Sequence, residues 1–322
     1  DYRFDGISYT AAQKDELDDV TVVLCNHESY DENGTCIGCG KQMEAAIERN
    51  GVTTRYETLT EALDVSEDGD TLKLLADIDE DITVTSGTFT LDATGRTISG
   101  DLNVESGAKL TVNGGTINKN TVCAKGGKLT ATGGTSFKGT IDCIGEGSFT
   151  FCGFEGAFTG AGSINVYYSV FKSTIKVSNE FYAISSSSEN EITIDVDKNG
   201  KLGLIMGFYA GNIKSEGELN ISDTNHSGII TAESGSKLKI SRGKLNSVEI
   251  NENVDVTLSG GSFGTIKVSG KQLIDCLAED VGEGNCYAFV DKDGNVVDGR
   301  VNSLTDVTII HNHVHDCIWD TM

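Results

Sequence analysis

The sequence predicts an all-β protein built as a single-stranded parallel β-helix, a β-solenoid with about 18–20 residues in each coil. Segments in which apolar and polar residues alternate recur about every twenty residues between Leu102 and Phe158. Glycines separate these segments, and the chain contains 39 Gly and no Pro. A strand of three to five residues cannot bury its apolar side alone, but copies of it can when they stack at the ~4.8 Å spacing of paired strands.

An alignment of three consecutive repeats indicates which residues point inward. The first strand of each repeat carries apolar or small residues at both ends: Leu102–Val104, Val122–Ala124 and Ile141–Cys143. The second strand follows after a glycine: Leu110–Val112, Leu129–Ala131 and Phe149–Phe151. Because side chains alternate between the two sides of a strand, this alignment places Cys143 in the core and Cys123 and Cys152 on the outside.

The two ends of the chain resemble each other. Tyr2–Val23 and Tyr287–Ile310 both contain Tyr-x-Phe followed by Leu-x-Asp-Val-Thr, at an offset of about 286 residues. Chance similarity is an alternative, but the order and the spacing of the two motifs agree. We therefore expect tandem copies within the same chain, with residues 1–24 as the tail strand of a preceding module and residues 304–322 as the start of the next linker.

Residues 44–70 have the pattern of a hairpin followed by a short helix. Asn50-Gly51 lies between two strand-like runs and predicts a tight hairpin turn. Thr58-Leu-Thr-Glu61 has the form of a capping box, which predicts a short amphipathic helix. The open end of a solenoid presents unpaired backbone groups, so we expect this helix to cover that end.

The remaining segments complete the predicted domain organisation. Residues 25–43 form a linker before the hairpin, and the solenoid itself fills residues 71–270. Residues 271–303 begin with apolar residues at helical spacing and continue into a second hairpin, which predicts a C-terminal cap. Cys276 and Cys286 lie in this cap, and the sequence leaves open whether they form a disulfide.

The start of the solenoid carries a family resemblance. Tyr56–Leu63 followed by Asp68–Ile78 resembles the first segment of pectin-lyase-like β-helices. It is more closely similar to repeat modules in large, tandem-repeat surface proteins of Gram-positive gut bacteria, a group that includes immunoglobulin-binding, superantigen-like proteins of commensals. The resemblance implies an extracellular, cell-wall-attached module with an immunoglobulin as its first candidate partner; the residues themselves do not specify that partner.

The linker contains a Cys/His motif, Cys25-x-His27-x8-Cys36-x2-Cys39-Gly40. Three thiols and an imidazole at this spacing suit tetrahedral zinc, and the glycine lets the backbone turn around the metal. Four protein ligands would leave no open coordination position, so we predict a structural zinc knuckle and no catalytic metal. A disulfide between two of the three thiols is the alternative.

Two other polar segments are not expected to form sites. Asp195-x-Asp197-x-Asn199-Gly200 begins like a calcium loop, but Met206 stands where an EF-hand requires Glu, so we do not expect calcium. His226 lies in a turn-like segment, and we expect its side chain at the surface.

Aromatic residues are concentrated in the middle of the chain, where the repeat is least regular. Eleven of the twenty-two Phe, Tyr and Trp residues fall between Phe149 and Tyr209, including three consecutive pairs. Neighbours in a strand point to opposite sides, so each pair should place one ring outside and form a binding patch. The alternative is that these rings fill a wider core. The candidate ligand-binding residues are Tyr167, Tyr168, Phe171, Phe181, Tyr182, Phe208 and Tyr209.

Charge and composition narrow the function classes. A formal net charge of -24 at pH 7 disfavours nucleic acid and anionic membranes as partners. Catalytic β-helices need carboxylates that converge on one face, often with a nearby Arg or Lys for the sugar acid. The only arginines within the coils are Arg96 and Arg242, which are far apart in the sequence, so we predict no catalytic residues. We expect a non-catalytic, extracellular binding module that recognises a host protein or a glycan. A carbohydrate-active enzyme and a passive spacer are the alternatives.

Overall fold

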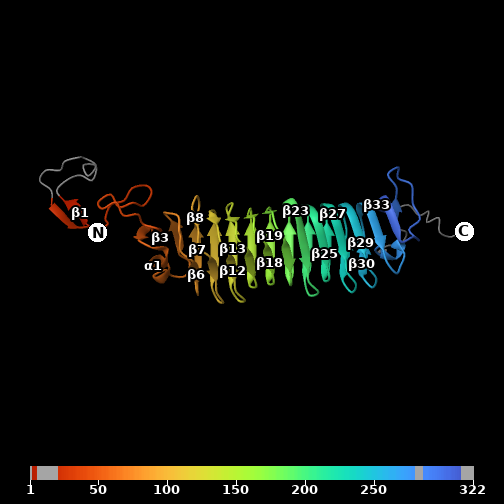
Figure 1. The fold of residues 1–322 in the computed structure, drawn as a ribbon, viewed down its shortest axis with the longest axis horizontal. Coiled ribbons are helices and arrows are strands. Elements are labelled where there is room, and N and C mark those ends of the chain that lie inside the picture. Colours follow the sequence, from red (N-terminus) through yellow and green to blue (C-terminus); the bar gives the residue numbers. More distant parts are fainter. Residues whose placement is uncertain (1, 6–20, 280–285, 313–322) are drawn as a thin grey trace.

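A computed structural model describes residues 2–5, 21–279 and 286–312 of the chain. Most of these residues belong to an elongated stack of coils that runs along the long axis of the molecule (Figure 1). Strands account for 55% of the structure and helices for 4%. The parallel β-solenoid has about 11 turns. The predicted fold class is confirmed.

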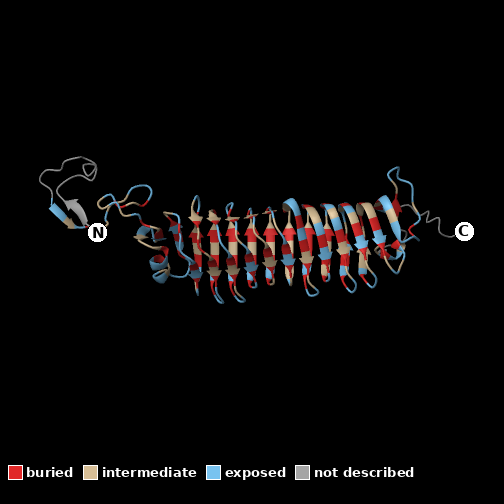
Figure 2. Ribbon diagram, in the orientation of Figure 1, coloured by how far each residue is buried: buried red, intermediate tan, exposed pale blue. Residues whose placement is uncertain are grey.

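Three faces surround the core, and the first is a continuous sheet to which each coil adds one strand. Partners lie in register, as where Leu110 pairs with Leu129. Inward residues of these strands are buried and their neighbours are more exposed, which gives the alternating colours of Figure 2. In spatial order this face consists of β4 (Val52–Tyr56), β3 (Ala45–Arg49), β5 (Thr71–Leu74), β7 (Thr88–Asp92), β10 (Lys109–Asn113), β13 (Lys128–Thr132), β16 (Glu146–Thr150), β19 (Ser163–Tyr167), β22 (Glu180–Ile184), β24 (Lys201–Ile205), β26 (Glu218–Ser222), β28 (Lys237–Ile240) and β30 (Asp255–Leu258).

The other two faces are separate in the first half of the stack and merge in the second. The second face comprises β8 (Thr97–Ile98), β11 (Thr116–Ile117), β14 (Ser136–Phe137), β17 (Gly153–Phe154) and β20 (Val170–Phe171). The third comprises β6 (Ile82–Val84), β9 (Leu102–Val104), β12 (Thr121–Cys123), β15 (Ile141–Cys143), β18 (Phe158–Gly160) and β21 (Ile175–Val177). Long strands then cover both faces: β23 (Ser187–Val196), β25 (Phe208–Ser215), β27 (Thr224–Ala232), β29 (Gly243–Ile250) and β31 (Gly261–Val268).

Coil length varies more than the sequence repeat predicts. On the first face Ile164 pairs with Phe181, which closes a coil shorter than the predicted range. Phe181 then pairs with Leu202, which closes a coil longer than that range. Part of the extra length lies in the long strand β23, where the pairing with β25 contains a register shift, and the rest lies in the turn between β23 and β24.

The sequence alignment was wrong by one residue at Cys123. This residue pairs with Val104 and Cys143 on the third face, so its side chain is buried. Cys152 is buried as well. The expected outward positions of both cysteines are therefore wrong. At Cys123 the reason is a slip of one residue along the strand, which exchanges the inside for the outside. Cys152 lies between β16 and β17, where strand alternation does not apply.

Phenylalanine rings from all three faces fill the middle of the solenoid. Phe137, Phe154 and Phe171 stack along the second face with ring centroids 5.6 and 4.8 Å apart. Phe158 of the third face meets Phe149 of the first face edge-to-face at 5.3 Å, and all five rings are buried. Much of the aromatic-rich segment therefore fills the core, as the alternative interpretation of the sequence predicted.

A hairpin and a helix close the N-terminal end of the stack. Strand β3 pairs antiparallel with both β4 and β5. Asn50 and Gly51 both have positive φ, as a two-residue type I′ turn requires. Helix α1 (Leu59–Asp64) follows Thr58, whose hydroxyl oxygen accepts a hydrogen bond from the backbone N–H of Glu61 at 3.1 Å. The predicted turn, helix and N-cap are confirmed.

The C-terminal end is closed by the 3-10 helix η2 (Leu273–Cys276) and by a hairpin of β32 (Cys286–Val290) and β33 (Ser303–Asn312). Strand β33 pairs antiparallel with β31, the last long strand of the stack. Residues 304–312 are thus part of this cap and not of a linker, which corrects the boundary expected at residue 304; residues 313–322 lie outside the described part of the chain. No disulfide joins Cys276 to Cys286.

His226 is a core residue, so the expected surface position is wrong. It lies in β27, between Tyr209 of β25 and Leu245 of β29 in an inward ladder. Within the described structure neither its ring nitrogens nor the Tyr209 hydroxyl has a hydrogen-bond partner of good geometry. Burial lowers the pKa of His226 to about 4, although backbone groups of Gly211 and Gly228 lie close enough to act in the opposite direction.

This buried imidazole predicts a loss of stability in mild acid. The unfolded chain binds a proton at His226 below pH ~6.5, while the folded chain resists protonation down to the lowered pKa. The stability that this residue contributes is therefore complete above pH ~6.5. It declines as the pH falls from there towards the lowered pKa of about 4. We expect the wild-type chain to lose about 2 kcal/mol more free energy of unfolding between pH 7 and pH 4.5 than His226→Leu, measured by urea titration. Leucine already occupies the neighbouring ladder position, Leu245. Equal losses in the two proteins would contradict the assignment.

Candidate functional site

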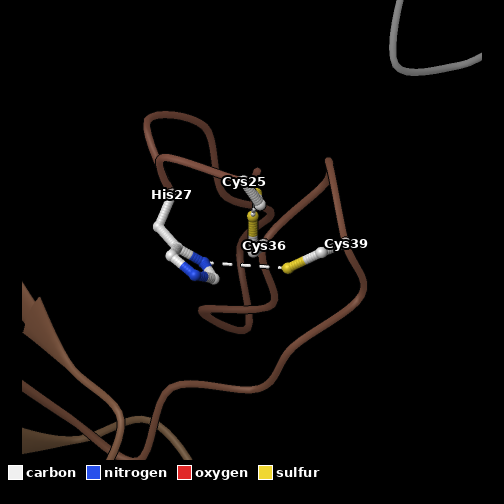
Figure 3. Close-up of side chains that lie close together, drawn as sticks. All are labelled: Cys25, His27, Cys36 and Cys39. Carbon is white, nitrogen blue, oxygen red and sulfur yellow. Dashed lines mark hydrogen bonds between the residues drawn. The ribbon is translucent and has the colours of Figure 1, made fainter. Parts of the chain in front are cut away.

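The four predicted metal ligands lie together between β2 (Thr21–Leu24) and β3 (Figure 3). One ligand atom of each residue lies within 4.8 Å of all the others. The Sγ atoms of Cys25 and Cys36 are 3.5 Å apart, and Cys39 Sγ is 3.7 Å from His27 Nδ1. A tetrahedral zinc with ordinary bond lengths separates two sulfurs by about 3.8 Å and a sulfur from a nitrogen by about 3.6 Å. The cluster can therefore hold a metal ion with little rearrangement.

Local hydrogen bonds bring the ligands together from both sides of a loop. The Asp31 carboxylate accepts hydrogen bonds from the backbone N–H groups of Asn33 and Thr35, which turns the chain between the two ligand pairs. The Gly40 N–H then donates to the Cys36 carbonyl at 2.8 Å. Gly40 has a φ of 75°, so the glycine after the last cysteine makes the left-handed turn that the motif predicts.

The environment of the cluster favours a thiolate at Cys36. Burial raises the pKa of this thiol, but hydrogen bonds from the backbone N–H groups of Cys39 and Gly38 and from the Cys25 thiol outweigh it and lower the pKa to about 7. At Cys39 burial is the dominant effect and raises the pKa to about 11. Metal binding needs thiolates, so a cation would have to draw the proton from Cys39.

The cysteine cluster is attached to the N-terminal hairpin. The Arg55 guanidinium of β4 lies 4.5 Å from the centre of the Tyr30 ring. Lys41 forms an ion pair with Glu57, just beyond β4. No disulfide joins the three cysteines of the cluster, so the disulfide alternative is not formed in this structure.

The seven candidate aromatic residues divide into three groups. Phe171, Phe181 and Tyr209 are buried, so their assignment to a surface patch is wrong. Tyr167 and Tyr182 are half-buried. Only Tyr168 and Phe208 are largely exposed, at 56% and 65%. The alternation rule held for Phe181-Tyr182 and Phe208-Tyr209, but Tyr168 is a corner residue beyond the end of β19.

Tyr168 belongs to a column of corner residues that runs along the stack. Each of these residues comes directly after a strand of the first face. The backbone N–H of Phe151 donates a hydrogen bond to the carbonyl of Tyr167, and the N–H of Tyr168 donates to the carbonyl of Ile184, each at 3.0 Å. Successive corners therefore stack. The column occupies the left-handed region of backbone conformation with φ between 49° and 56°: Phe151, Tyr168, Ser185, Met206 and Asp223. The corresponding corners of two earlier coils are Gly114 and Gly133, residues that adopt this conformation without strain.

Two aromatic rings and a methionine thus stand at corners where glycine would be the ordinary choice. Phe151 and Tyr168 are 59% and 56% exposed, and their rings stack at 5.2 Å with an interplanar angle of 17°. Met206 is 52% exposed two coils further on. The left-handed conformation costs a bulky residue about 1–2 kcal/mol, and such strain is concentrated at functional sites. We call Phe151, Tyr168 and Met206 the aromatic corner.

Sequence reasoning missed Phe151. It was aligned with inward strand residues, although it follows Thr150 in the way that Gly133 follows Thr132. The replacement of a corner glycine by an aromatic residue was the signal that would have found it.

A groove runs across β23, β25, β27, β29, β31 and β33, and Phe208, two residues after Met206, is among its lining residues. Its volume is about 740 Å³. Its charged lining residues are Lys244, Lys292 and Asp306. Among the described lining residues Asp306 is the only carboxylate. Polar and aromatic side chains therefore border a shallow depression next to the aromatic corner.

Fold and site together define a parallel β-solenoid with a Cys/His cluster near its N-terminal end that can hold a metal ion. Comparisons with known proteins found no matching family model, no matching curated protein and no matching solved structure. Among the described residues no helix has the length and the apolar character needed to cross a membrane.

Proposed function

We propose that this chain is a non-catalytic binding module that recognises a partner macromolecule through the outer side of the solenoid. The observation that supports this most strongly is the aromatic corner. Stacked, half-exposed rings on a rigid scaffold lose little conformational entropy when they are covered, and aromatic residues dominate the energetics of protein interfaces. Two stacked rings and a methionine on one edge, all held in strained conformations, are difficult to account for as packing.

The partner of this module is a host protein, and immunoglobulin is the first candidate. This choice rests on the resemblance of Tyr56–Ile78 to modules of surface proteins from Gram-positive gut bacteria, some of which bind immunoglobulin. The same resemblance supports an extracellular location in a cell-wall-attached chain with tandem modules.

The groove beside the corner supports a glycan as the second candidate ligand. Asn225, Lys244 and Asn246 line it and offer hydrogen-bond donors, and Phe208 offers a ring face. Retaining glycosidases need two carboxylates about 5–5.5 Å apart. The single carboxylate Asp306 in the described lining favours binding over hydrolysis.

Zinc in the Cys/His cluster has a structural role in this proposal. Cys25, His27, Cys36 and Cys39 supply a complete tetrahedral set, and the donor types suit zinc better than calcium or magnesium. With the cation bound, the loop would be fixed against the N-terminal hairpin.

The test is a binding experiment with the full chain immobilised and purified serum immunoglobulin as the probe. We expect the double variant Phe151→Gly/Tyr168→Gly to bind at least about 10-fold more weakly than the wild type, because both rings are lost. Glycine is the native residue at the equivalent corners Gly114 and Gly133, so relief of backbone strain offsets part of the lost packing. Thermal melting of each protein checks that the fold is kept.

The control is Ile144→Ser, which removes an exposed apolar side chain at a different corner of the same part of the stack. It should leave binding unchanged. If the wild type does not bind immunoglobulin, capture from whole serum and mucus tests the broader proposal. A wild-type chain that captures nothing would be a spacer, and turnover of a glycan would make it an enzyme; either result contradicts the proposal.

A further inference from the structure

The short hairpin near the N-terminus repeats the pairing of the hairpin that closes the C-terminal end. Strand β1 (Tyr2–Asp5) pairs antiparallel with β2, and Tyr2 lies opposite Leu24. In the C-terminal hairpin Tyr287 lies opposite His311. The sequence similarity aligns Tyr2 with Tyr287 and Leu24 with His311, so the two hairpins share one register.

In the C-terminal hairpin this register places apolar residues against the last coil. Strand β33 lies along β31, where Ile309 pairs with Gly261 and is only 5% exposed. The Thr308 hydroxyl is 2.9 Å from the Ser262 hydroxyl of β31. The hairpin therefore covers the backbone edge of the last coil and buries apolar residues against it.

The N-terminal hairpin carries the same residue types but covers no coil. Val22 and Thr21 correspond to Ile309 and Thr308 in the aligned sequences. Val22 is 60% exposed, and β1 and β2 form a sheet of their own, apart from the coil stack in Figure 1. Figure 2 accordingly shows β2 as mostly exposed.

We propose that the β1–β2 hairpin is the closing lid for the last coil of a second copy of this module. Thr21 and Val22 would lie along an edge equivalent to β31, with Val22 buried as Ile309 is here. Consecutive modules would then join end to end, because the lid of one coil stack continues directly into the Cys/His cluster and the first strands of the next. This inference does not depend on the proposed ligand.

A hairpin exchange within the full chain tests the proposal. Residues 287–311 are replaced by residues 2–24, and a second variant lacks residues 287–311 altogether. We expect the deletion to expose the edge of β31 and to speed hydrogen exchange of its amides at least about 10-fold. The exchanged hairpin should restore the slow exchange of Gly261–Val268 and bring the melting temperature close to that of the wild type.

Val22→Asp supplies the matched control in two backgrounds. In the exchange variant we expect it to return β31 to the fast exchange of the deletion, because an unpaired carboxylate would be buried. In the unmodified chain it should change nothing, because Val22 is exposed there. The proposal is overturned if the exchange variant behaves like the deletion, and an exchange variant that does not fold counts as this result. It is also overturned if Val22→Asp has the same effect in both backgrounds.

Discussion

We expect Phe158→Ala to lower the free energy of unfolding by about 4 kcal/mol, the largest effect of a single core substitution in this chain. The Phe158 ring is buried and lies within 5.3 Å, centroid to centroid, of Phe149, Phe154 and Phe181. Removal of the ring leaves a cavity that the stacked coils cannot collapse to fill, because each strand is fixed by neighbours on both sides. Urea titration followed by circular dichroism measures the change.

Two controls separate core burial from a general effect of removing aromatic residues. Phe158→Leu keeps most of the volume and should cost less than half as much. Phe208→Ala removes a ring that is 65% exposed and should change stability by no more than about 1 kcal/mol. If Phe208→Ala destabilised the chain as much as Phe158→Ala, the division of the aromatic residues into core and surface would be wrong.

Loss of the metal should have the second large effect, confined to the N-terminal loop. We expect one zinc ion per chain by elemental analysis of the wild type, and binding weakened more than about 100-fold in Cys36→Ser, because one of four ligands is lost. Amides of residues 25–43 should then exchange faster in Cys36→Ser, while those of the coils stay protected.

Cys143→Ala is the matched control for this experiment. It removes a buried thiol outside the cluster, so the metal content should stay at one ion per chain. A wild-type chain without metal, in which Cys25 and Cys36 form a disulfide under oxidising conditions, would contradict the metal assignment.

The sequence was sufficient for features that depend on residues close together in the chain. The Cys/His spacing, the Asn50-Gly51 turn and the Thr58 N-cap each involve fewer than twenty residues, and the structure contains all of them. The solenoid was predictable for a related reason, since each coil contacts only its neighbours and repeats its own pattern.

Features that depend on exact register were harder to predict. The short coil between Ile164 and Phe181 is followed by the long coil between Phe181 and Leu202, and this variation defeats a fixed period. An error of one residue at Cys123 reversed its side, and an error of two residues placed Phe151 in a strand and not at a corner. The groove could not be predicted because its lining comes from six strands between Ser188 and Thr308.

We propose that the aromatic corner is the surface on which a partner binds. Hydroxyl-radical footprinting of the chain bound to immunoglobulin, or to whatever protein it captures from serum, tests this most directly. We expect protection of Phe151, Tyr168 and Met206, with the exposed Val52 at the N-terminal hairpin turn unchanged. Protection confined to the ends of the stack, with the rings of the corner still oxidised at the rate of the free chain, would contradict it.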